Sequence, residues 1–180
     1  MRRLEGKVVI ITGASRGIGA AAAKAIAAEG AALMLAARTG RDLSAVASEL
    51  APAGTPVEAM ACDVADFAQV QAAADRTRQV FGRIDALINN AGVIEPIGPL
   101  ASSDPAAWAH AAAINFTGVY NGMRAVLPAM RSQGSGAVWL AKSIWLTGLM
   151  PDALIWRCMS VATVPGDSEK TRTPRPRFSR

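Results

Sequence analysis

The sequence contains a glycine-rich stretch, Thr12-Gly13-Ala14-Ser15-Arg16-Gly17-Ile18-Gly19, between a short apolar run and an alanine-rich run. The apolar run, Lys7 to Ile11, predicts a buried strand of a parallel sheet, and residues 20–29 predict a helix that ends at Gly30. Glycines that connect a strand to a helix direct backbone N–H groups and the positive end of the helix dipole towards one point. Such a turn is suited to a phosphate, although it also occurs where no ligand binds.

Strand-like and helix-like runs alternate along the first 141 residues. Strands are predicted at residues 7–11, 32–37, 57–61, 84–88 and 137–141, with a helix between each pair. Parallel strands are joined by right-handed crossovers, so this alternation predicts an α/β fold. We expect a Rossmann-type doubly wound parallel sheet with strand order 3-2-1-4-5, incomplete at its carboxyl-terminal side.

Capping residues predict the ends of two helices. Asp66 is a candidate N-cap for a helix that ends at Gly82, and Asp104 is a candidate N-cap directly before a proline. The second helix is predicted to continue to Ser132, with a kink at Pro128.

Four motifs resemble the short-chain dehydrogenase/reductase family in identity, order and spacing. They are Thr12-Gly13-x-x-x-Gly17-x-Gly19, Cys62-Asp63-Val64, Asn89-Asn90-Ala91-Gly92, and Asn115 within Ile114-Asn115-Phe116-Thr117-Gly118. The resemblance extends from about Leu4 to about Val138. It implies an NAD(P)-binding Rossmann domain and an oxidoreductase that acts on a small-molecule alcohol or carbonyl compound.

The resemblance also implies which residues bind the cofactor. They are Gly13, Ser15, Arg16, Gly17, Ile18, Gly19, Arg38, Asp63, Val64, Asn90, Ala91 and Gly92. Asp63 would bond the adenine amino group and Val64 would pack on the ring, although Asp63 could equally cap the next turn. The segment from Asn90 to Gly92 is interpreted as binding or structural, not catalytic.

Two arginines predict NADP rather than NAD as the cofactor. Arg38 follows the second strand, and Ala37 stands where related enzymes that prefer NAD often have Asp. Arg16 supplies a second cation, and a guanidinium pairs with a phosphate through two hydrogen bonds. The alternative is that either arginine is a solvated surface charge.

The catalytic residues of the family are matched only in part. The resemblance places Asn115 and Ser143 at catalytic positions, and a Tyr-x-x-x-Lys pattern should follow Ser143 by about a dozen residues. No tyrosine follows Tyr120 in the sequence. The prediction is therefore an NADP(H)-dependent oxidoreductase that lacks this pattern; the alternatives are an inactive NADP(H)-binding module or a non-functional truncated product.

Composition changes where the resemblance ends. Alanine occupies 36 of the first 141 residues but two of the last 39. We expect a dinucleotide-binding domain at residues 1–145 and a divergent, partly disordered tail at 146–180, produced by a frameshift, a truncation or natural variation.

Charge and hydropathy limit the other function classes. The net charge is +5, and residues 167–180 contribute five basic against two acidic side chains, so a solvated tail is favoured over a nucleic-acid surface. No apolar run is long enough for a membrane span or a signal peptide, which predicts a cytoplasmic protein without a membrane partner. Cys62 and Cys158 are expected as free thiols, with no metal site. The resemblance adds a homo-oligomer as a partner.

Overall fold

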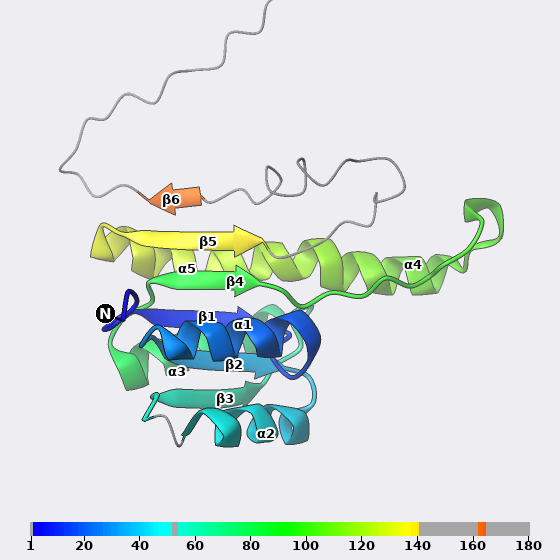
Figure 1. Cartoon of the computed structure of the whole chain (residues 1–180). Coiled ribbons are helices and arrows are strands. Elements are labelled where there is room, and N and C mark those ends of the chain that lie inside the picture. The colour runs from blue at the N-terminus through cyan, green and yellow to red at the C-terminus, as the bar shows by residue number, and fades with distance from the viewer. Residues whose placement is uncertain (1, 52–53, 141–161, 165–180) are drawn as a thin grey trace, which may run out of the picture.

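A computed structural model describes residues 2–51, 54–140 and 162–164 of the chain. One sheet runs through the molecule, with α1 and α2 on one face and α3 and α5 on the other (Figure 1). The strands are β1 (Val8–Thr12), β2 (Ala32–Ala37), β3 (Val57–Ala61), β4 (Ala86–Asn89), β5 (Gly136–Leu140) and β6 (Ala162–Val164). The helices are α1 (Gly17–Ala28), α2 (Gly40–Leu50), α3 (Phe67–Phe81), α4 (Pro105–Ala112) and α5 (Gly118–Gln133), with a π-helical turn at Ala113–Thr117 and a short 3-10 turn at Leu100–Ser102.

The strand order is β3-β2-β1-β4-β5-β6. The first five strands are parallel, which confirms the predicted Rossmann-type order 3-2-1-4-5. β6 pairs antiparallel with β5, from Ala162 opposite Val138 to Val164 opposite Gly136. This strand lies within the range predicted as a divergent tail, and the sequence analysis did not predict it.

Both faces of the sheet are buried at its central strands β1 and β2, as their apolar sequences predict. Every residue of β1 is buried, and its neighbours Ile10 and Ile11 point to opposite faces. Ile10 packs in a cluster with Val126 and Met130 of α5, while Ile11 packs in a second cluster that includes Leu43 of α2. A strand that buries alternate side chains on two helical layers can occupy only the middle of such a sheet.

The predicted caps of α3 and α4 are confirmed. The Asp66 carboxylate accepts a hydrogen bond from Ala68 N at 2.9 Å, and Gly82 ends α3 in the left-handed conformation. The Asp104 carboxylate accepts from the first-turn N–H groups of α4. The predicted helix to Ser132 is confirmed, since the chain is helical from Pro105 to Gln133 and continues through Pro128; the π-helical turn at Ala113–Thr117, between α4 and α5, was not predicted.

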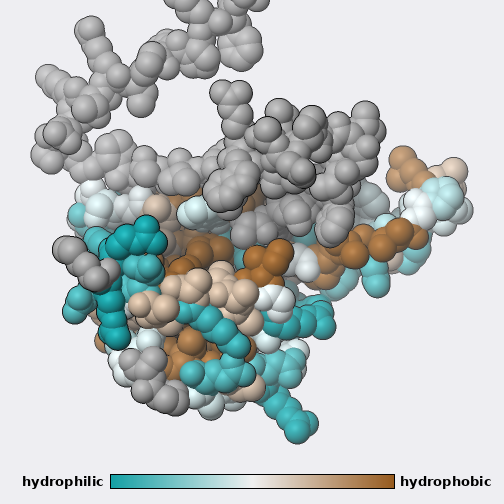
Figure 2. All heavy atoms as spheres, viewed as in Figure 1, coloured by the Kyte–Doolittle hydropathy of each residue, from teal (hydrophilic) through white to brown (hydrophobic). Residues whose placement is uncertain are grey.

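An arm projects from the sheet beyond β4. It consists of the segment that follows β4 and of α4, and hydrophobic side chains gather along it (Figures 1 and 2). Its exposed apolar residues include Ile94, Ile97, Leu100 and Trp108, each more than half exposed. The arm therefore presents apolar surface outside the core of the sheet.

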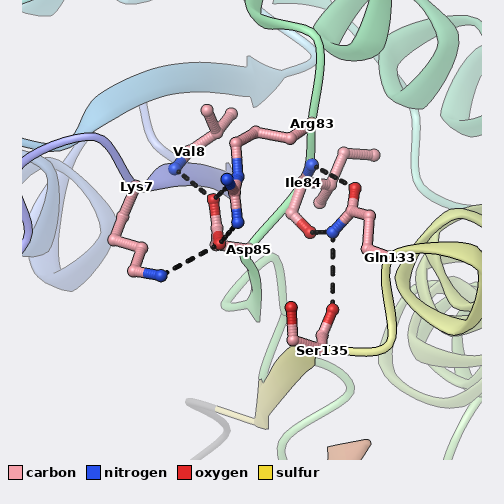
Figure 3. A network of polar contacts seen from close by, with 7 residues as sticks. All are labelled: Lys7, Val8, Arg83, Ile84, Asp85, Gln133 and Ser135. Carbon is pink, nitrogen blue, oxygen red and sulfur yellow. Dashed lines mark hydrogen bonds and ion pairs between the residues drawn. The ribbon is translucent and has the colours of Figure 1, made fainter. Parts of the chain in front are cut away.

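The amino end of the sheet is held by two polar side chains (Figure 3). The Asp85 carboxylate accepts hydrogen bonds from Val8 N at 3.0 Å, from Lys7 Nζ at 3.4 Å and from the Arg83 guanidinium at 2.7 Å. The Gln133 side chain accepts from Ile84 N and donates to the Ile84 carbonyl. These contacts tie β1, the start of β4 and the end of α5 together.

The pKa of Asp85 reflects two opposing effects. Burial raises it, but the hydrogen bonds from Arg83 and Val8 N and the charges of Arg83 and Lys7 together bring the pKa below its ordinary value. The ionised carboxylate is therefore stabilised in the folded chain, and it contributes stability above its unfolded pKa that is lost as the pH falls through the folded pKa.

We expect Asp85→Asn to lower the free energy of unfolding by about 2 kcal/mol at neutral pH, because the buried charged acceptor is lost. The deficit should start to shrink as the pH falls below about 4 and should disappear below the lowered folded pKa of Asp85, where the wild-type carboxyl is also neutral. Urea unfolding at several pH values measures both. The matched control is Asp75→Asn, which removes an exposed carboxylate from α3 and should cost at most about 0.5 kcal/mol. A deficit that stays constant from neutral to acid pH would contradict the account.

Candidate functional site

A cleft of about 270 Å³ lies at the carboxyl edge of the sheet. Its lining comes from the segments that follow four parallel strands and from the π-helical turn: Gly13, Ser15, Arg16, Ala37, Arg38, Thr39, Asp42, Cys62, Asp63, Val64, Asn90, Ala91, Gly92, Val93 and Ile114. The strand order reverses between β1 and β4, and open parallel sheets bind their ligands outside the carboxyl ends at such a point.

The cleft brings together nine of the residues predicted to contact a cofactor. They are Gly13, Ser15, Arg16, Arg38, Asp63, Val64, Asn90, Ala91 and Gly92. Gly17, Ile18 and Gly19 lie in the first turn of α1 and are not part of the lining. Asn115 lies in the π-helical turn beside the cleft, and Ser143 lies outside the described residues.

The glycine turn brings α1 close to the sheet. Gly13 has φ +65°, and a Cβ there would lie 2.8 Å from the Cα of Ala91. A Cβ on Gly19 would collide with the carbonyl oxygen of Gly13 and would approach the Asn90 amide to 2.5 Å. The N-cap of α1, Arg16, makes no side-chain cap hydrogen bond, so no side chain of the N-cap competes with an anion for the first-turn N–H groups.

Thr12 and Asn90 join the two central walls of the cleft. The Thr12 hydroxyl accepts hydrogen bonds from Asn90 N at 3.0 Å and Ala91 N at 3.1 Å. In return, the Asn90 side-chain amide donates to the carbonyls of Thr12 at 3.0 Å and Gly13 at 3.1 Å. Four hydrogen bonds therefore fix the end of β4 against the turn between β1 and α1, and Asn90 acts here as a structural residue of the cleft.

The Asn115 side chain holds the next part of the same wall. Its Oδ1 accepts from Val93 N at 3.1 Å, and its Nδ2 donates to the Val93 carbonyl at 2.7 Å. A Cβ on Gly92 would lie 3.1 Å from the same Oδ1. The residue predicted as catalytic therefore contacts the backbone that follows β4.

Asp63 serves the turn that the sequence analysis left as its alternative role. Its carboxylate accepts from Ala65 N at 3.0 Å, while its backbone N–H donates to the Gln69 side chain. The side chain still lines the cleft, so the local turn and a contact with a ligand are compatible.

Sequence reasoning missed several lining residues, among them Thr39, Asp42, Cys62, Val93 and Ile114. No sequence signal marks Asp42 as a lining residue, since Thr39-x-x-Asp42 resembles only a capping box, and the Thr39 side chain makes no cap hydrogen bond. Burial, with smaller effects from Asp63 and Asp66, raises the pKa of the Cys62 thiol to about 11. Cys62 is a buried free thiol that stays protonated at neutral pH, as the prediction of a free thiol has it.

The described residues hold neither a cluster of metal-ligating side chains nor a membrane-spanning helix. In the part of the chain that the structure describes, no three or more His, Cys, Asp or Glu side chains are grouped to hold a metal ion. Among the same residues, no helix combines the length and the apolar character needed to cross a membrane.

The four motifs and the cleft that they form agree with the comparison to known families. The sequence model of the short chain dehydrogenase family matches residues 7–151. The chain belongs to the short chain dehydrogenase family. This confirms the resemblance on which the sequence analysis relied.

Curated relatives and solved structures match about three quarters or more of this chain. D-threitol dehydrogenase of Mycolicibacterium smegmatis is 42% identical over 138 residues, which cover 76% of this chain and 52% of the relative. Levodione reductase of Leifsonia aquatica is 39% identical, with 76% and 52% covered. A metagenomic short-chain oxidoreductase solved in complex with NADP is 40% identical with a TM-score of 0.75, covering 82% of this chain and 66% of that one. The chain spans about half the length of the curated relatives it matches.

We expect Thr12→Val to lower the free energy of unfolding by about 2–4 kcal/mol, because two backbone N–H groups lose their acceptor. The matched control is Thr77→Val, since Thr77 is equally buried but its hydroxyl bonds only the Ala73 carbonyl of its own helix. That change should cost less than about 1 kcal/mol. Chemical denaturation of both variants makes the comparison, and equal losses would show that the Thr12 hydroxyl does not brace the cleft.

Proposed function

We propose that the cleft binds NADP(H) in preference to NAD(H), and that the protein is an oxidoreductase acting on an alcohol or carbonyl compound. The observation that carries the cofactor preference is the presence of Arg16 and Arg38 in one cleft. Within the described residues, neither guanidinium forms an ion pair with another side chain. Two cations without such a partner suit the extra phosphate of NADP.

The donor groups of the cleft fit a dinucleotide. The first turn of α1 offers backbone N–H groups for the pyrophosphate, and the space in front of Gly17 is open. Asp63 and Val64 at the end of β3 provide a polar acceptor and an apolar contact for the adenine. Gly13, Ser15, Ile18, Gly19 and the segment from Asn90 to Gly92 complete the proposed cofactor site.

The bound nicotinamide would exchange a hydride with the carbon of the alcohol or carbonyl group. The chain's own contribution is to hold the cofactor through Arg16, Arg38 and the α1 terminus. Asn115 positions the backbone of Val93 at the wall of the cleft, and Ser143 is proposed to orient the substrate oxygen.

A second candidate is a module that binds NADP(H) without turnover. The observation that favours it is the place of Tyr120, which no tyrosine follows in the sequence. Tyr120 is 54% exposed on α5, accepts a hydrogen bond from Arg124, and is not part of the cleft lining. An absorbance assay with NADPH and a panel of ketones separates the two candidates. The panel includes levodione, because one relative is named for its reduction. Loss of NADPH absorbance supports the enzyme, and binding without turnover supports the module.

We also propose a cytoplasmic location, a small-molecule substrate, and self-association as the principal partner interaction. Exposed apolar side chains on α4 and on the π-helical turn, Trp108 and Phe116, support an interface between copies. Residues 146–180 are proposed as a segment distinct from the dinucleotide-binding domain at 1–145.

We expect Arg38→Gln to raise the Kd for NADPH at least about tenfold, because a charge-assisted bidentate contact to the 2′-phosphate is lost. The Kd for NADH should change less than about twofold, since NADH has no phosphate there. Titration with nucleotide fluorescence as the signal measures both constants. Arg41→Gln is the control, because Arg41 is exposed, follows closely in the chain and is not part of the lining. Equal weakening of both nucleotides would argue against the assigned role of Arg38.

A further inference from the structure

We propose that Asp42 limits the preference of the cleft for NADP(H), by placing a negative charge beside the site for the 2′-phosphate. The inference rests on the proposed function, since it concerns the same cleft and the same cofactor. It goes beyond that function because it assigns to Asp42 an effect opposite to that of Arg38.

Asp42 lies at the same cleft as Arg38. Asp42 is an exposed residue in the first turn of α2, four residues after Arg38, and both residues line the cleft. Thr39, the N-cap of α2, also lines the cleft, and its side chain makes no cap hydrogen bond. The amino terminus of α2 therefore lines the same cleft as Arg38.

The Asp42 carboxylate is not paired with a cation within the described residues. Across the described ranges, its carboxylate takes part in no ion pair, and the Thr39 side chain forms no cap hydrogen bond. Its negative charge is therefore not neutralised by Arg38 or Arg16. A direct ion pair there would have weakened the field of both charges at a ligand, whereas an unpaired carboxylate repels a nearby phosphate more strongly.

The lining of the cleft has as many acidic as basic side chains. Arg16 and Arg38 bring two positive charges, while Asp42 and Asp63 bring two negative ones. Asp63 lies after β3 and is hydrogen-bonded within its own turn, whereas Asp42 lies on the element that begins next to Arg38. A carboxylate at the start of a helix also uses the favourable dipole field that would otherwise attract a phosphate. Asp42 is therefore the lining residue best placed to oppose the 2′-phosphate.

The test is the ratio of the Kd for NADH to the Kd for NADPH in the full chain carrying Asp42→Asn. Removing the charge should raise this ratio about fivefold at low salt, and the increase should shrink as salt screens the interaction. Asp42→Glu keeps the charge and should leave the ratio within about twofold of the wild type.

Glu49→Gln is the matched control, because it makes the same charge change in the last turn of the same helix, where Glu49 pairs with Lys24. It should leave the ratio unchanged, and melting temperatures show that each variant is folded. Saturable NADPH binding to the wild type with an unchanged or lower ratio for Asp42→Asn overturns the inference and leaves the proposed function standing. No saturable binding of either nucleotide to wild type and variant overturns both.

Discussion

The hydrogen bonds between Thr12 and Asn90 are the constraint on which the cleft depends. They exchange backbone and side-chain groups between the end of β1 and the end of β4, two strands that are 78 residues apart in the chain. Because both partners are held at two points, the turn between β1 and α1 cannot move away from the end of β4. The close approach of α1 also requires glycine at position 19, since a Cβ there would collide with the Gly13 carbonyl oxygen and the Asn90 side-chain amide.

The parallel sheet was predictable because its strands are short, mostly apolar runs that alternate with helix-like runs, although β3 also contains Glu58. Strands β2 and β3 were predicted with their observed bounds, because the residues on either side of them do not suggest a different start or end. The π-helical turn was not predictable, because its residues are compatible with a regular helix and Asn115 is bonded to Val93, 22 residues away. β6 was missed because three residues carry no period, and their pairing is decided by the free edge of β5.

Some residues of the candidate site were also predictable from the sequence, and others were not. Residues that belong to short motifs, such as Gly13, Asp63 and Gly92, were predicted as one site, and they meet in one cleft because parallel strands end at one edge. Ile114 and Asp42 were missed because their places depend on how a helix packs at the end of the sheet. The role of the Thr12 hydroxyl was missed for a related reason, since its two donors are the backbone N–H groups of Asn90 and Ala91, directly after β4.

In the proposed function, the segments that follow β1, β2, β3 and β4 form one nucleotide site. Hydrogen exchange with and without NADPH tests it most directly, because it reports on each segment separately. We expect slower exchange in peptides covering residues 12–19, 37–42, 62–64 and 89–93, and no change near Asp85 and Gln133 at the opposite edge of the sheet. Unchanged exchange in those four segments, or equal protection at both edges, would contradict the account.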